Sequence, residues 1–394
     1  MNLFDRCRDF QSKIEYLKTH NQFFYLREFD PAATPVVTQK GKEYIMLGSN
    51  NYLGLVDHPK VIEATRKALE NFGTGACSSR VLTGTTSLHT KLEKRLARFK
   101  GTQDSVVFST GFMTMMGTIS AITGEDDLIF SDELNHASIV EGCRLSKAKK
   151  QIYRHNDMGH LEEQLASTPS EKSKMIVTDG VFSMKGTVAN IPAIKELADR
   201  YGAAVMVDDA HGTGVLGEKG HGTLEHYDLE GKIDLVCGTF SKSLCTIGGF
   251  TGSNSEVVTF LKLNSRSFIF TASPPPFVAA TVLACLDVID NEPEILRRLR
   301  DNTEFVKTKL KDYGFVLEDT ITPIIPIMIN DDEKTFRMAG ALEEAGVIIN
   351  PVVYPAVPPG ASLIRVSVMA SLSTEQLSEA LDKMKAVGKK LQII

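Results

Sequence analysis

A lysine between small hydroxyl residues is the first feature of this sequence that could carry chemistry. Lys242 stands in the segment Gly238-Thr-Phe-Ser-Lys-Ser-Leu244, directly after the apolar run 233–237. A lysine at the exit of a strand can form a Schiff base with a cofactor aldehyde, since desolvation lowers the pKa of its amine. The hydroxyls on either side could bind a phosphate. Alone, the segment is equally compatible with a solvated loop lysine.

An acidic pair and a histidine follow a second apolar run. The segment Val205-Met-Val-Asp-Asp-Ala-His-Gly212 places Asp208 at the end of a predicted buried strand, with His211 three residues later. A carboxylate at this position can pair with a protonated pyridine nitrogen, and a nearby histidine can bond a ring hydroxyl. An isolated Asp-Asp pair is more often a metal ligand or a helix cap.

Two further motifs carry weaker signals. Asn135-His-Ala-Ser138 supplies His136, whose imidazole could stack on a flat ring, although a single histidine is usually structural. Ser109-Thr-Gly-Phe112 joins a predicted strand to a predicted helix, and a helix N-terminus is a natural phosphate site, although such turns also occur without a ligand. All four motifs together, in this order, predict a pyridoxal-phosphate enzyme with Lys242 as its Schiff-base lysine.

The elements that position these motifs alternate between short strands and helices. Predicted strands cover residues 106–109, 127–130, 175–178, 203–207, 235–238 and 249–252. Apolar residues recur at helical spacing over 88–99 and over 191–198. This alternation predicts an α/β fold with a mainly parallel sheet covered on both faces, and ligands bind such sheets at the strand ends.

The pattern changes near the triproline at residues 274–276, where a long helical region begins. From Thr322 onward apolar strand runs mix with helices, and a capping box of Ser373 with Gln376 opens the last helix. We therefore expect an N-terminal arm over residues 1–45, a large cofactor-binding domain over 46–282 and a small domain over 283–394.

Composition excludes several classes of protein. The chain of 394 residues is 42% hydrophobic and 24% charged, with a formal net charge of −5, which gives no hint of a nucleic-acid surface. No apolar run approaches the length of a membrane span, and the charged N-terminus does not resemble a signal peptide. The six cysteines are scattered without metal spacing, so we expect reduced thiols, no metal site and a cytoplasmic location.

The chain resembles the α-oxoamine synthase family of fold-type I pyridoxal-phosphate enzymes over nearly its whole length. The resemblance implies the transferase fold of this type, with a mainly parallel seven-stranded central sheet and a smaller C-terminal α+β domain. The motifs that carry it are Ser49-Asn-Asn-Tyr-Leu-Gly-Leu55, Asn135-His-Ala-Ser138, Thr178-Asp-Gly-Val-Phe-Ser-Met184, Val207-Asp-Asp-Ala-His-Gly212 and Gly238-Thr-Phe-Ser-Lys242.

The same resemblance implies roles around the cofactor, pyridoxal 5′-phosphate. Lys242 forms the Schiff base, His136 stacks on the ring and Asp208 pairs with the pyridine nitrogen. The other implied contacts are His211 at the ring hydroxyl with Ser183 nearby, Gly111, Phe112 and Thr239 at the phosphate, and Thr271 and Ala272 from a neighbouring subunit. A homodimer with its active site at the subunit interface follows from this implication.

For the substrates, the resemblance assigns the amino-acid carboxylate to Arg365 and a substrate-side contact to Asn50. A bidentate arginine suits a carboxylate, although an isolated arginine in a strand is usually on the surface. The implied reaction joins an amino acid to an acyl thioester, with CoA or an acyl carrier protein as the leaving group, and loses CO2.

Within the family the chain most resembles the soluble bacterial serine palmitoyltransferases. Ser241 and the segment Ile349-Asn-Pro-Val-Val353 are similar to theirs, whereas Cys245-Thr246 and Ser78-Ser79-Arg80-Val81 depart from their pattern. We therefore expect L-serine and a long-chain acyl thioester, with glycine, alanine or a sulfonated serine analogue as alternatives. An aminotransferase of the same fold and a silent partner subunit are disfavoured, the latter because Lys242 is present.

Overall fold

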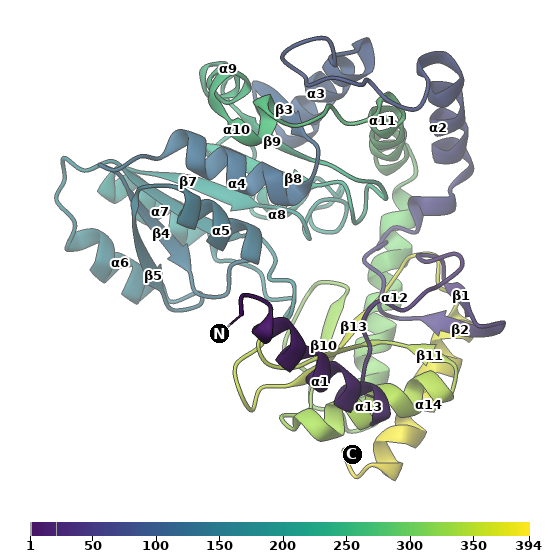
Figure 1. Ribbon diagram of the computed structural model, residues 1–394. Helices are drawn as coiled ribbons and strands as arrows, with labels where there is room; N and C mark the ends of the chain where they lie inside the picture. Colours follow the sequence, from purple (N-terminus) through teal and green to yellow (C-terminus); the bar gives the residue numbers. More distant parts are fainter. Residues whose placement is uncertain (1, 21) are drawn as a thin grey trace. The chain divides into compact units, whose positions relative to one another are not determined.

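Figure 1 shows the computed structural model, which describes residues 2–20 and 22–394. The chain divides into two compact units, one of Asn50–Leu299 and the other of Met1–Ser49 together with Arg300–Ile394. The division expected from the sequence, at 45/46 and 282/283, remains a prediction. Its second boundary lies inside a helix, α11 (Pro276–Asn291), which belongs entirely to the first unit.

The larger unit is built on a seven-stranded sheet, counted over the described residues. β9 pairs antiparallel with both β3 and β8, and the remaining pairs are parallel, which confirms the mainly parallel sheet. In spatial order the strands are β3 (Asp104–Phe108), β9 (Gly249–Ser253), β8 (Leu235–Thr239), β7 (Ala203–Asp208), β6 (Lys174–Asp179), β4 (Leu128–Asp132) and β5 (Lys149–Tyr153).

The period-2 alternation of side chains in these strands builds two separate apolar cores. In β7, Val205 and Val207 pack into the core beneath α6 (Met158–Ala166) and α7 (Ile191–Tyr201). Met206, between them, packs into the opposite core beneath α4 (Gly111–Ile122) and α5 (Ala137–Leu145). Figure 1 shows these helix pairs against the sheet. The sheet is therefore covered on both faces, as predicted.

The other helices of this unit surround the same sheet. The predicted helical spacing over 88–99 falls in α3, and α11 packs against α2 and α3. Their bounds are η1 (Leu55–Asp57), α2 (Pro59–Phe72), α3 (Ser87–Lys100), α8 (Thr223–His226), α9 (Ser255–Asn264) and α10 (Arg266–Ile269).

The smaller unit contains two three-stranded sheets, ordered β1-β2-β11 and β10-β13-β12 within the described residues. Its last helix opens with the predicted capping box, because the Ser373 hydroxyl accepts from Gln376 N–H and the Gln376 side chain bonds back to Ser373. Its elements are α1 (Asp5–Thr19), β1 (Val36–Gln39), β2 (Lys42–Met46), β10 (Ile324–Met328), α13 (Asp332–Glu344), β11 (Val347–Ile348), β12 (Asn350–Val352), β13 (Leu363–Ser367) and α14 (Thr374–Lys390).

Helix α12 (Pro293–Asp312) contains the boundary between the two units. Over residues 2–20 and 22–394, no helix combines the length and the apolar character that a membrane crossing requires.

Candidate active site

Three neighbouring parallel strands end at one edge of the central sheet and bring polar side chains together there. Asp179, Asp208 and Thr239 are the last residues of β6, β7 and β8, and Asp179 is the register partner of Asp208. A cavity of about 250 Å³ opens at this edge. It is lined by Thr110, Gly111, Phe112, Met115, His136, Ser138, Asp179, Ser183, Asp208, Ala210, His211, Thr239, Ser241, Lys242, Ile247 and Gly248.

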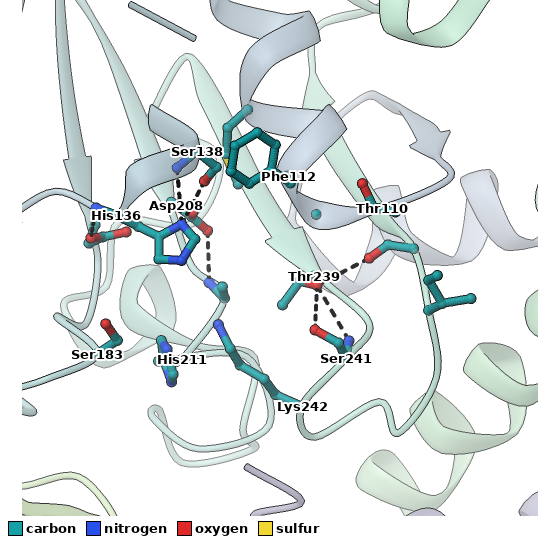
Figure 2. Close-up of a pocket in the computed structure, with 16 residues that line it drawn as sticks. Thr110, Phe112, His136, Ser138, Ser183, Asp208, His211, Thr239, Ser241 and Lys242 are labelled. Atoms are coloured by element: carbon teal, nitrogen blue, oxygen red, sulfur yellow. Dashed lines mark hydrogen bonds between the residues drawn. The ribbon is translucent and has the colours of Figure 1, made fainter. Parts of the chain in front are cut away.

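Most of the residues predicted for the cofactor line this cavity. Lys242, His136, Asp208 and His211 extend into the same space in Figure 2. Gly111, Phe112, Ser183 and Thr239 also line it. Thr271, Ala272, Asn50 and Arg365 are not among the lining residues, and they are described below.

One end of the cavity is formed by the start of helix α4. Thr110 caps this helix by accepting Met113 N–H at 3.1 Å, so the N–H groups of Gly111 and Phe112 have no partner inside the helix. A Cβ on Gly111 would lie 2.6 Å from Thr239 Oγ1, so only glycine lets the helix approach β8 this closely. Ser241 Oγ lies 3.0 Å from Thr239 Oγ1. These donors form a natural anion site.

The opposite end of the cavity presents buried carboxyl groups. Asp208 is 4% exposed and accepts Ala210 N–H at 3.1 Å. Burial raises the pKa of Asp208 to about 6, although the Lys242 ammonium opposes this shift. Burial and the neighbouring Asp208 raise the pKa of Asp179 well above its usual value. A carboxylate at Asp208 is therefore favoured by a cation beside it, such as a protonated ring nitrogen.

His136 is held by the first turn of α5. Its ring Nδ1 accepts Ser138 N–H at 3.2 Å and lies 2.8 Å from Ser138 Oγ. The backbone N–H of His136 donates to Asp179 Oδ2 at 2.8 Å. Burial, with the charge of Lys242, lowers the pKa of His136. These contacts fix the orientation of the imidazole, and the lowered pKa favours its neutral form, which suits a group that stacks on a flat ring.

His211 is connected to the predicted substrate-side residue Asn50 through a buried tyrosine. The Tyr52 hydroxyl lies 2.8 Å from His211 Nδ1 and donates to Asn50 Oδ1 at 3.3 Å. Tyr52 is fully buried, so this contact fixes the histidine ring relative to the Asn50 loop. Tyr52 was not among the predicted site residues, although Tyr52 stands inside the motif that begins at Ser49.

The remaining predicted residues lie outside the cavity lining. Ala272 forms an isolated bridge with Ser79, and its carbonyl accepts a 2.6 Å bond from Ser109 Oγ, while Thr271 precedes it in the chain. Arg365 lies in β13 of the smaller unit, is 5% exposed and donates from Nη1 to Ser367 Oγ at 2.8 Å. Their roles toward cofactor and substrate stay predictions.

Several lining residues were not predicted. The most consequential is Asp179, which could have been found because it directly follows the predicted strand 175–178 and stands inside the quoted motif that begins at Thr178. Ser241, next to Lys242, is one of the hydroxyl residues expected from the motif to be able to bind a phosphate, although it was not named as a site residue. Thr110, Ser138 and Ala210 stand next to or two residues from predicted residues in the chain. Met115 lies further along α4, and Ile247 and Gly248 lie just before β9.

The residues present fit pyridoxal phosphate. The N-terminus of α4, which begins at Gly111, suits the phosphate together with Thr239 and Ser241. The buried carboxylate of Asp208 suits the ring nitrogen. The neutral imidazole of His136 suits its ring face, and Lys242 reaches the space between these groups (Figure 2).

Comparison with known proteins agrees with this fit. The family model for aminotransferase class I and II matches residues 42–384. The chain is 46% identical to a serine palmitoyltransferase of Sphingobacterium spiritivorum, over 96% of this chain and 95% of that one. It is 41% identical to an 8-amino-7-oxononanoate synthase of Bacillus velezensis, over 98% of both chains.

A solved structure extends the similarity to the fold. A high-resolution structure of a serine palmitoyltransferase with pyridoxal phosphate covers 100% of both chains, at 35% identity and a TM-score of 0.97. The cofactor is therefore pyridoxal 5′-phosphate, and the fold is that of fold-type I enzymes. The chain belongs to the aminotransferase class I and II family and, within it, to the α-oxoamine synthases.

Proposed function

We propose that this α-oxoamine synthase condenses L-serine with palmitoyl-CoA to give 3-ketodihydrosphingosine, free CoA and CO2. The observation that carries the proposal is the cavity in which Lys242 stands with Asp208 and His136. Similarity to the Sphingobacterium serine palmitoyltransferase over 96% of the chain supports the choice of substrates.

Five residues have distinct tasks in this proposal, three of them in the cavity and two, Asn50 and Arg365, outside its lining. Pyridoxal phosphate, when bound, supplies an electron sink for the charge that develops on the amino-acid α-carbon. Lys242 would hold the cofactor, and its free amine would be the candidate base for the α-proton of the amino acid. Asp208 keeps the ring nitrogen protonated, and His136 covers the ring face. Arg365 binds the amino-acid carboxylate, and Asn50 lies on the substrate side.

The alternative substrates belong to sister reactions. The chain is also 41% identical to the Bacillus 8-amino-7-oxononanoate synthase, which supports that activity as the second candidate, with glycine C-acetyltransferase beside it. Ser241 favours the palmitoyltransferase because acetyltransferases and oxononanoate synthases more often carry glycine there. Its hydroxyl contacts Thr239 at the phosphate end of the cavity.

We also propose a cytoplasmic homodimer whose active site includes Thr271 and Ala272 of the second subunit. Phe270, next to these residues, is 72% exposed, and Leu82, near the bridge of Ser79 with Ala272, is 77% exposed. Large apolar side chains exposed together support burial by a partner. Light scattering on the purified protein distinguishes a dimer from a monomer.

Absorbance and thiol release test the proposed reaction. The cofactor-loaded protein is titrated with L-serine, glycine and L-alanine while its visible spectrum is recorded, and palmitoyl-CoA or acetyl-CoA is then added. A spectral shift with serine, followed by CoA release with palmitoyl-CoA alone, supports the proposal. A response to glycine with acetyl-CoA, or to alanine alone, moves the assignment to a sister reaction.

A further inference from the structure

Asp209, the second carboxylate of the acidic pair, is directed away from the cavity. Asp208 lines the cavity and Asp209 does not, as the alternation of side chains at the end of a strand requires. Asp209 N–H donates to the Cys237 carbonyl at 2.8 Å, so the extended backbone continues past the end of β7. The Asp209 side chain is completely buried.

Both oxygens of the Asp209 carboxylate accept hydrogen bonds. Lys100 Nζ donates to Oδ2 at 2.6 Å, and the Thr213 hydroxyl, which lies 3.3 Å from the same oxygen, donates to the Asp209 backbone carbonyl at 2.8 Å. Thr223 donates to Oδ1 from its backbone N–H at 3.0 Å and from Oγ1 at 2.5 Å. Lys100 and Thr223 thus supply three donors to a group with about four lone-pair sites, which holds the carboxylate firmly in place.

Lys100 is the buried cation of this cluster. It is the last residue of α3, and its side chain is 2% exposed. Besides Asp209, its Nζ donates to the carbonyl of His221. Lys100 therefore ties Asp209 to a loop segment that follows it in the chain, and the two charges neutralise each other away from water.

Two glycines make room for this ion pair. A Cβ on Gly212 would collide with Asp209 Oδ1, and a Cβ on Gly222 would collide with Asp209 Oδ2. The Gly222 Cβ would also lie 2.7 Å from Lys100 Nζ, and Gly222 has a positive φ of 113°. The loop from 209 to 223 is thus folded around the Asp209 carboxylate.

Two cavity residues flank Asp209 at the start of this loop. Asp208 precedes it and His211 follows two residues later, and both line the cavity. Thr213 N–H donates to the Asp209 carbonyl at 3.0 Å, which closes a turn around His211. We propose that the Lys100–Asp209 ion pair is a positioning pair that fixes Asp208 and His211 against the cofactor. This inference rests on the cofactor contacts proposed above for Asp208 and His211.

Charge balance gives the pair a second effect on the same site. Without Lys100, the buried Asp209 carboxylate would stand uncompensated beside Asp208. Removing one partner of a buried pair leaves such a charge, whereas removing both can be nearly neutral. The loss of Lys100 should therefore weaken cofactor binding when residue 209 is an aspartate, and much less when it is an uncharged residue.

Substitution of the pair in the holoenzyme tests the proposal. Lys100→Met should weaken cofactor binding by about tenfold, a usual size for coupling between neighbouring sites, and should change the visible absorbance of the bound cofactor. The double variant Lys100→Met with Asp209→Asn should return the dissociation constant to within about threefold of the wild type, since the charge imbalance is removed.

The matched control is Lys174→Met. Lys174 is also a buried lysine, but it begins β6 and donates to the carbonyls of Ser170 and Lys172, about 16 Å of strand away from Asp179. It should lower the melting temperature without changing cofactor affinity or spectrum.

Three outcomes contradict the positioning role. The first is a Lys100→Met variant with a lower melting temperature but unchanged cofactor affinity and spectrum. The second is a double variant that binds cofactor as weakly as the single variant. The third is a Lys174→Met control that loses cofactor affinity as Lys100→Met does. Asp208→Asn is measured alongside. If it leaves cofactor affinity unchanged while Lys100→Met reduces it, the proposed contact of Asp208 fails independently of the ion pair.

Discussion

Replacing Gly111 by alanine tests the phosphate end of the cavity most sharply. The added Cβ would lie 2.6 Å from Thr239 Oγ1 and 2.7 Å from Thr239 Cβ. Rotation of the threonine can move its hydroxyl but leaves Cβ in place, so the start of α4 and the end of β8 must separate. The proposed phosphate donors on the two elements would then no longer converge.

The magnitude follows from the cost of overpacking. Forcing an extra methyl group into a filled site costs about 1–3 kcal/mol. If the bound state bears this cost, cofactor affinity falls about 5- to 150-fold. The dissociation constant is measured by following the cofactor's absorbance and the protein's fluorescence during titration of the apoenzyme.

Gly124→Ala is the matched control for Gly111→Ala. Gly124 follows the other end of α4, and the nearest atom to a Cβ there is Asp127 Oδ2 at 3.8 Å, an ordinary contact. The control should bind cofactor like the wild type. If Gly111→Ala also keeps its affinity within twofold of the wild type, the helix terminus does not hold the phosphate.

Further predictions concern the carboxyl groups, the substrate arginine and a helix cap. The raised pKa of Asp208 means that the apoenzyme loses about 3 kcal/mol as pH rises from about 4 through about 6, because ionisation of the buried carboxyl is disfavoured when folded. A cation on the cofactor ring favours the ionised carboxylate, so the gain in melting temperature on cofactor binding should be larger at pH 7 than at pH 5. Asp208→Asn should reduce this difference, and a difference as large as that of the wild type would contradict the prediction. Asp179→Asn should keep cofactor affinity within about threefold, because burial and the neighbouring Asp208 raise the pKa of Asp179 and so favour its neutral acid, which asparagine resembles. A loss as large as that of Asp208→Asn would contradict this. Arg365→Ala should raise the KM for the amino acid about 10- to 100-fold, which corresponds to the free energy of hydrogen bonds to charged groups, with kcat less affected. An unchanged KM would rule out the role of Arg365 in binding the carboxylate. Ser373→Ala should cost about 1 kcal/mol of unfolding free energy by removing the α14 cap while leaving cofactor affinity unchanged, and unaltered denaturant unfolding would contradict this.

The strands of the central sheet could be predicted because most of them are buried runs with clear ends. The predicted strand 203–207 became β7, Ala203–Asp208, and the motif at its end put Asp208 at the carboxyl edge. β5 (Lys149–Tyr153) was missed because it lies at the edge of the sheet, where its lysines and glutamine are not buried.

The contacts that connect distant parts of the chain could not be read from the sequence. Tyr52 meets His211 across 159 positions, and Lys100 meets Asp209 across 109. Lys100 is the last residue of an amphipathic helix, where lysines are common and usually solvated. The local sequence therefore does not indicate that Lys100 forms a buried ion pair. Asp179 was within reach of prediction, since two adjacent parallel strands both end in aspartate.

Borohydride reduction of the holoenzyme, followed by peptide mapping, tests most directly whether Lys242 carries the cofactor. The account predicts that the reduced cofactor is found on the peptide containing Lys242, and that Lys242→Ala still binds cofactor without becoming labelled. A label on a different lysine, or labelling that persists in Lys242→Ala, would contradict the account.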